Sequence, residues 1–135
     1  MKLRVLHYPE KGKIATFTAG LSAALDVKAD KIPPAYNCDR ERLLIAGISC
    51  GKSLPSALSL FLRGLNKDRV QNVAIFTDAP EEAVAEMKQT IETAGASVLD
   101  VKTVKGSALP FLKSVKPEEA ADLLDWAKGI CEKLQ

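Results

Sequence analysis

The sequence lacks any long hydrophobic run, and no region of it is dominated by charge of one sign. It has no stretch of about 18 consecutive apolar residues, so we expect no membrane span and no membrane partner. Its 19 basic and 17 acidic side chains are interspersed and leave a net charge of +2, which argues against a nucleic-acid-binding surface. Met1 leads into a core-like apolar segment rather than the hydrophobic region of a signal peptide. We therefore expect a cytoplasmic protein.

Cysteine and histidine are also scarce. The three cysteines, Cys38, Cys50 and Cys131, are odd in number and widely spaced, so they predict neither a disulfide framework nor a zinc motif. Free thiols fit a reducing cytoplasm. His7 is the only histidine. The sequence therefore assigns no metal site and no catalytic residue.

Five segments have the length and composition of β-strands. Residues Leu3–His7, Leu43–Ile48 and Val73–Thr77 are rich in Val, Ile and Leu with little alternation, which is typical of strands buried on both faces. Residues Asp26–Asp30 are short and half polar, and residues Ala96–Val104 alternate between apolar and polar side chains. These two segments suit the edges of a sheet.

Helical patterns separate most of these strands. Apolar side chains form one helical stripe over Lys13–Leu25, and a second stripe follows Pro55. Asp78 is expected to cap a third helix that has Pro80 in its first turn, and Pro117 opens the last helix. The short segment between the second and third strands predicts a helix that is reduced or missing.

The order of elements is therefore β-α-β-β-α-β-α-β-α, and it predicts one three-layer α/β/α domain over residues 1–135. Such alternation favours a parallel sheet with right-handed crossovers. Three buried strands and two edge strands fit a five-stranded parallel sheet of order 2-1-3-4-5. In such sheets ligands bind at the carboxyl edge, at the switch point between the first and third strands.

Several segments resemble those of a short flavodoxin. Tyr8 ends the first strand, and Pro9–Ile14 occupies the place of that family's phosphate loop. Leu43–Gly47 resembles the family's third strand, Gly51–Pro55 resembles the loop after it, and Trp126 lies in the last helix where the family often has a similar residue. The resemblance implies a flavodoxin-like fold, noncovalently bound FMN, transfer of single electrons and a redox protein partner. It leaves the oligomeric state open.

The phosphate loop is a degenerate form of the family's loop. That loop is rich in Ser and Thr around a Gly-Asn pair, and only Gly12 of the pattern is present here. Pro9 has no N–H to donate, and Glu10 adds a negative charge, whereas Lys11 and Lys13 are cationic. The resemblance implies FMN contacts from three loops, at Tyr8, Pro9, Glu10, Lys11, Gly12, Lys13, Ile14, Ala15, Ser49, Cys50, Gly51, Lys52, Ser53, Thr77 and Asp78.

Two further interpretations stay open, and the sequence favours an electron-transfer or binding protein over a catalyst. The domain could have kept the fold and lost FMN, acting as a binding or regulatory module. It could also be a thiol-dependent enzyme, with Cys50 activated by a helix amino-terminus and Lys52 and assisted by His7. Ala46–Ser53 fits a nucleotide-binding P-loop only loosely, and a glycine turn between strand and helix explains it better.

Overall fold

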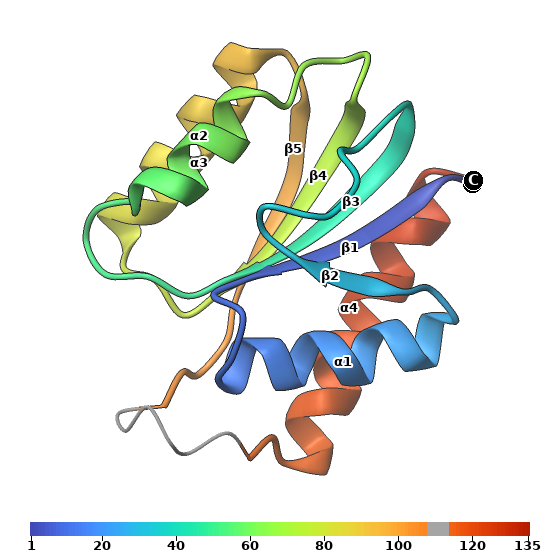
Figure 1. The fold of residues 1–135 in the computed structure, drawn as a ribbon. Helices are drawn as coiled ribbons and strands as arrows, with labels where there is room; N and C mark the ends of the chain where they lie inside the picture. Colours follow the sequence, from blue (N-terminus) through green and yellow to red (C-terminus); the bar gives the residue numbers. More distant parts are fainter. Residues whose placement is uncertain (108–113) are drawn as a thin grey trace.

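The computed structural model of the protein describes residues 1–107 and 114–135, in which a twisted sheet lies between two pairs of helices (Figure 1). The order of elements confirms the expected alternation. None of the helices in these ranges is long and apolar enough to cross a membrane. The elements are β1 (Leu3–Tyr8), α1 (Lys13–Leu25), β2 (Ala29–Lys31), β3 (Glu41–Ile48), α2 (Ser56–Arg63), β4 (Val70–Thr77), α3 (Glu81–Ala94), β5 (Ser97–Thr103) and α4 (Pro117–Lys133).

The five strands form one parallel sheet in the order β2-β1-β3-β4-β5, as the sequence predicts. Helices α1 and α4 cover one face, and α2 and α3 cover the other (Figure 1). From Leu43 to Ile48 the side chains of β3 are all buried, because this interior strand meets a helical layer on each side. The short strand β2 and the largely exposed strand β5 form the two edges.

The sheet carries a separate hydrophobic core on each face. Alternation along β1 places Leu6 with the residues under α2 and α3, and places Val5 with those under α1 and α4. The second core centres on Phe76, whose ring lies edge-on to Phe17 of α1 at 6.3 Å and to Trp126 of α4 at 6.4 Å. This ring therefore links both helices of that layer to the middle of the sheet.

The first edge strand begins three residues later than expected. Asp26 lies not in β2 but at the carboxyl end of α1, with φ 55° and ψ 47°. The N–H groups of Asp26 and Val27 donate to carbonyls of the last helical turn, Ala23 O and Ser22 O. The carbonyls at a helix end need such donors, and Asp tolerates the left-handed conformation better than most residues. Strand pairing consequently starts only at Ala29.

Residues 32–40, between β2 and β3, contain no helix, which confirms the expected loss of that element. The segment is instead held by polar contacts. The carboxylate of Asp30 accepts hydrogen bonds from the N–H groups of Lys31 and Ala35, each at 2.8 Å. The guanidinium of Arg4 donates to the Tyr36 carbonyl at 3.0 Å. These bonds give the segment a defined path where a crossover helix would otherwise pack.

The change Asp30→Ala tests this anchoring. Loss of the two hydrogen bonds should lower the free energy of unfolding by about 1–2 kcal/mol at neutral pH. The hydrogen bond from the Ala35 N–H is the largest cause that lowers the pKa of Asp30. A lowered pKa stabilises the fold above the pKa of an unfolded Asp, and this stabilisation disappears as the pH falls through the folded value. The difference in free energy of unfolding between wild type and variant, measured with urea, should therefore become smaller at acidic pH. An equal difference at neutral and acidic pH would contradict this role of the Asp30 carboxylate. As a control, the exposed Asp125→Ala should change the free energy of unfolding little at either pH.

The change Gly47→Ala tests the packing at the middle of the sheet. A methyl group at Gly47 would lie 2.7 Å from Cε2 of the Phe76 ring, closer than any carbon contact allows. The ring is held between two helices, so we expect a loss of about 1–3 kcal/mol in thermal or urea unfolding. The matched control is Gly20→Ala in α1, where nothing lies within 4 Å and the change should slightly stabilise the helix. A neutral Gly47→Ala would contradict the close approach.

Candidate functional site

The loops that follow β1, β3, β4 and β5 meet at the carboxyl edge of the sheet. Backbone hydrogen bonds join them in pairs just past the strand ends. The Ser49 N–H donates to the Tyr8 carbonyl at 2.8 Å, and the Val104 N–H donates to the Thr77 carbonyl at 2.9 Å. These bonds continue the parallel ladder and bring together the loops that the sequence places at the switch point.

Thr77 fixes the turn that leaves β4. Its buried hydroxyl donates to the Ile48 carbonyl at 2.6 Å and accepts from the Ala79 N–H at 3.0 Å. Because this buried hydroxyl both donates and accepts a hydrogen bond, its burial leaves no polar atom unpaired. The two bonds also fix the conformation of the turn after β4. Thr77 therefore orients the loops after β3 and β4 from within the protein, and its own side chain is not exposed to solvent.

Asp78 lies at the junction of three loops. Its Oδ2 accepts a hydrogen bond from the Ser49 hydroxyl at 2.9 Å. On the β5 side, a methyl group built on Gly106 would lie 3.0 Å from the carboxyl carbon of Asp78, so the backbone there passes close to the carboxylate. Gly106 was not predicted as a site residue, although a glycine three residues after an edge strand can mark such a close approach of the backbone.

The expectation that Asp78 caps α3 is wrong. The residue at the N-cap is Pro80, with φ −70° and ψ 164°, and no side chain donates or accepts a capping bond there. Asp78 lies two residues too early, and its carboxylate is engaged by Ser49. Glu81 and Glu82 occupy the first turn of α3, where their charges interact favourably with the helix dipole.

The amino-terminus of α1 faces the same edge without any side-chain cap. Gly12 is the N-cap residue, with φ 117° and ψ −169°, and nothing lies within 4 Å of the position that a Cβ would take there. The first backbone bond of the helix runs from the Thr16 N–H to the Gly12 carbonyl at 3.1 Å. The N–H groups before Thr16 have no carbonyl partner within the helix. They form a donor cluster at the positive end of the helix dipole.

Lys13 is engaged elsewhere than at this cluster. Its ammonium group forms an ion pair with Glu119 of α4 at 3.1 Å and lies 5.6 Å from the centroid of the Phe17 ring. Glu119 also accepts the Lys116 N–H at 3.0 Å, and that bond is the largest cause that lowers the pKa of its carboxyl group, followed by the hydrogen bond from Lys13. Lys13 thus ties α1 to α4, and Lys11 is the exposed cation of the loop.

The surroundings of Cys50 disfavour its thiolate form. Burial raises its pKa, and the charges of Asp78 and Glu86 raise it further. Helix α2 begins only at Ser56, so Cys50 does not lie at a helix amino-terminus. Cys50 packs on the α2/α3 face, whereas alternation along β1 puts His7 on the opposite face, with its Nδ1 2.9 Å from the Pro9 carbonyl oxygen. The structure therefore does not support the thiol-dependent alternative, in which a helix amino-terminus activates Cys50 and His7 assists it.

The other residues predicted for the site differ in their exposure, which limits what each could contact. Tyr8 is half-buried against the α2/α3 core and is the aromatic side chain at the end of β1.

No group of three or more His, Cys, Asp or Glu side chains in the described ranges could hold a metal ion. The exposed members of the predicted site are Pro9, Glu10, Lys11, Gly51, Lys52 and Ser53; the buried members are Ile14 and Thr77; the intermediate members are Tyr8, Gly12, Lys13, Ala15, Ser49, Cys50 and Asp78.

Two solved structures share this fold over nearly their whole length. A flavodoxin from the domain Archaea matches with a TM-score of 0.66 and 12% sequence identity, covering 99% of each chain. The solution structure of two-electron reduced Megasphaera elsdenii flavodoxin matches with a TM-score of 0.58 and 15% identity, covering 93% of this chain and 98% of the other. Neither a protein-family model nor a curated protein matches the sequence. The chain therefore has the flavodoxin-like fold.

The reactivity of Cys50 tests the charges at this edge. Either Asp78→Asn or Glu86→Gln removes a negative charge that raises the pKa of the thiol, so Cys50 should react with iodoacetamide at least roughly twofold faster at mildly alkaline pH. Glu86→Gln leaves the Ser49–Asp78 bond in place and so separates charge from local structure. Peptide-resolved mass spectrometry gives the rate, with Asp125→Asn as control. An unchanged rate in both variants would refute the electrostatic effect.

Proposed function

We propose that this protein binds FMN and carries single electrons, with the phosphate of FMN on the uncapped amino-terminus of α1. The observation behind this proposal is the position of that terminus. It follows β1 directly, beside the loop after β3, at the switch point of a flavodoxin-like sheet. Ligands of open α/β sheets bind at such switch points.

The donor groups there suit a phosphate. The N–H groups of Lys13, Ile14 and Ala15 precede the first backbone bond of the helix and have no side-chain cap. A helix amino-terminus with free N–H groups attracts a dianion through hydrogen bonds and the helix dipole. The open space at Gly12 admits close approach, and the exposed Lys11 adds a positive charge.

The loops after β3 and β4 would flank the ring system of FMN. Ser49 and Asp78 are joined by a hydrogen bond there, and the exposed residues Gly51–Ser53 follow in the same loop. Tyr8 supplies an aromatic side chain at the end of the neighbouring strand. FMN, when bound, would supply the one-electron chemistry, and the residues of these loops would hold it in place. A redox protein would be the partner.

A second candidate is a binding or regulatory module that has the fold without flavin. Three observations favour it. Lys13 is engaged by Glu119, and the exposed Glu10 adds a negative charge beside the donor cluster, so fewer cations face a phosphate. Asp78 and Glu86 add negative potential near Cys50. The raised pKa of Cys50 argues against the third candidate, a thiol-dependent enzyme.

Titration with FMN, followed by quenching of flavin fluorescence, distinguishes the first two candidates. We expect saturable binding at micromolar FMN, weaker binding of riboflavin because it lacks the phosphate, and a loss of roughly threefold or more in FMN affinity in Lys11→Ala. Riboflavin affinity should not change in that variant. Lys28→Ala, an exposed lysine beyond the far end of α1, is the matched control. No quenching at several hundred micromolar FMN would eliminate the flavin proposal and favour the binding module.

A further inference from the structure

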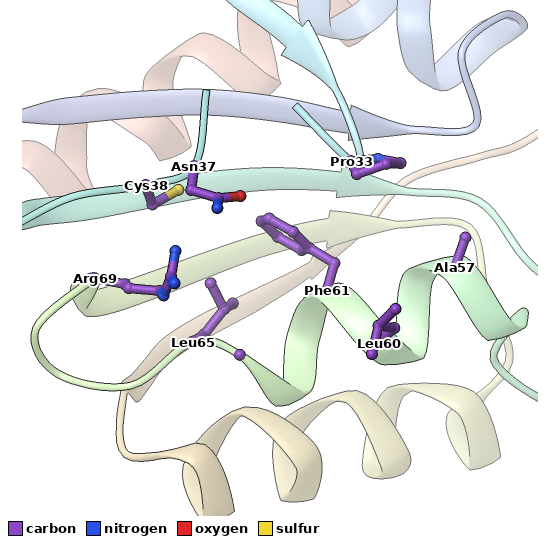
Figure 2. Close-up of a pocket in the computed structure, with 9 residues that line it drawn as sticks. Pro33, Asn37, Cys38, Ala57, Leu60, Phe61, Leu65 and Arg69 are labelled. Atoms are coloured by element: carbon purple, nitrogen blue, oxygen red, sulfur yellow. The ribbon is translucent and has the colours of Figure 1, made fainter. Parts of the chain in front are cut away.

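We propose that the cavity between residues 32–40 and α2 is a second site, which binds a small apolar molecule carrying one carboxylate, with that carboxylate at Arg69. The cavity has a volume of about 320 Å³ and lies where the missing crossover helix would pack. Its walls include Pro33, Asn37 and Cys38 on one side and Leu60 and Phe61 of α2 on the other (Figure 2). None of these residues belongs to the proposed FMN site.

The cavity is preformed because its covering segment is held at several points. The Ile32 N–H donates to the His7 carbonyl at 2.8 Å at one end of the segment. The bonds from Ala35 to Asp30 and from Arg4 to the Tyr36 carbonyl hold its middle. The segment therefore does not need to order when a ligand enters, which favours affinity.

The cavity walls are predominantly apolar. The Phe61 ring projects into the space between α2 and the covering segment (Figure 2). Leu65 closes the floor and is buried, whereas Leu60 is 67% exposed at the rim. An apolar ligand that fills this space would bury these apolar walls, and that burial would favour its binding. Its volume lies at the small end of the range for ligand pockets, which selects a single ring system or a medium-length chain.

The polar end of the cavity is cationic. The side chain of Arg69 is half-buried and extends toward Asn37 and Cys38 (Figure 2). Its backbone is held, since the Arg69 N–H donates to the Asn66 side chain at 3.1 Å and the Arg69 carbonyl accepts the Glu41 N–H at 2.9 Å. In the described part of the chain, no side chain or carbonyl accepts a hydrogen bond from the Arg69 guanidinium, and no carboxylate forms an ion pair with it.

The charges around Cys38 sum to a positive value. Its thiol is influenced by the cations Arg4 and Arg69 and by the anion Glu41. The Glu41 carboxylate lies 3.9 Å from Arg4 and 4.0 Å from Lys2, and no ion pair joins it to Arg69. A guanidinium binds a carboxylate through two parallel N–H bonds, and the Asn37 amide can add a third donor. This combination of one unpaired cation and apolar walls selects an apolar acid over a neutral molecule.

The test uses the fluorescent aromatic sulfonate 1-anilinonaphthalene-8-sulfonate as the probe. We expect the probe fluorescence to rise with saturation, and we expect sodium decanoate to displace the probe. The uncharged counterpart 1-decanol should need an at least roughly tenfold higher concentration to displace it. Arg69→Gln should reduce probe and decanoate affinity roughly tenfold, and Arg69→Lys should restore part of it. Leu60→Glu, which places a negative charge at the rim, should abolish binding. Arg63→Gln, an exposed arginine at the end of α2, should bind like wild type.

Labelling of Cys38 gives a second readout that does not depend on the probe. Decanoate should slow the reaction of Cys38 with N-ethylmaleimide several-fold and leave Cys131, far from the cavity on α4, unchanged. Far-ultraviolet circular dichroism confirms that each variant is folded. The proposal is overturned if decanol competes as well as decanoate, if Arg69→Gln binds like wild type, or if decanoate does not protect Cys38. FMN affinity should be unaffected by Arg69→Gln, so the two proposed sites can fail separately.

Discussion

The contact between the Phe76 ring and Gly47 is the constraint on which the rest of this structure depends. The two residues face each other across the central strands β3 and β4, and only a residue without a side chain leaves room for the ring. The ring in turn sets the positions of α1 and α4 through Phe17 and Trp126. β3 and β4 are both interior strands that meet a helical layer on each face, so any shift in this contact would be transmitted to both layers.

The position of α1 determines what its amino-terminus can do. The Lys13–Glu119 ion pair and the hydrogen bond from Trp126 to Asp100 at 2.9 Å tie α1, α4 and β5 together. This leaves the first turn of α1 at the sheet edge with uncapped N–H groups, while Lys13 itself is turned toward α4. The positive charge at this part of the edge therefore comes from the helix amino-terminus and Lys11, whereas Asp78 and Glu86 are negative charges near Cys50.

The missing crossover helix has a structural consequence on the α2/α3 face. A full helix between β2 and β3 would cover the side of α2 that carries Phe61, and residues 32–40 cover it only in part. The segment is held by hydrogen bonds to its backbone rather than by a packed apolar stripe, so a cavity remains beneath it. A concave surface is present without exposure of the core, because Leu65 and Cys38 are buried in its wall.

The sequence by itself determined the fold. Uninterrupted apolar runs identified β3 and β4 as interior strands, and the helical stripe over Lys13–Leu25 gave the bounds of α1, because burial on two faces and on one face leave different periodicities. Tertiary structure alone decided the site chemistry. Asp78 accepts from Ser49 instead of capping α3, Lys13 pairs with a residue 106 positions away, and Cys50 lies across the sheet from His7. These three arrangements depend on which side chains lie close together in the folded protein. Local sequence patterns cannot predict contacts between residues that are far apart in the sequence.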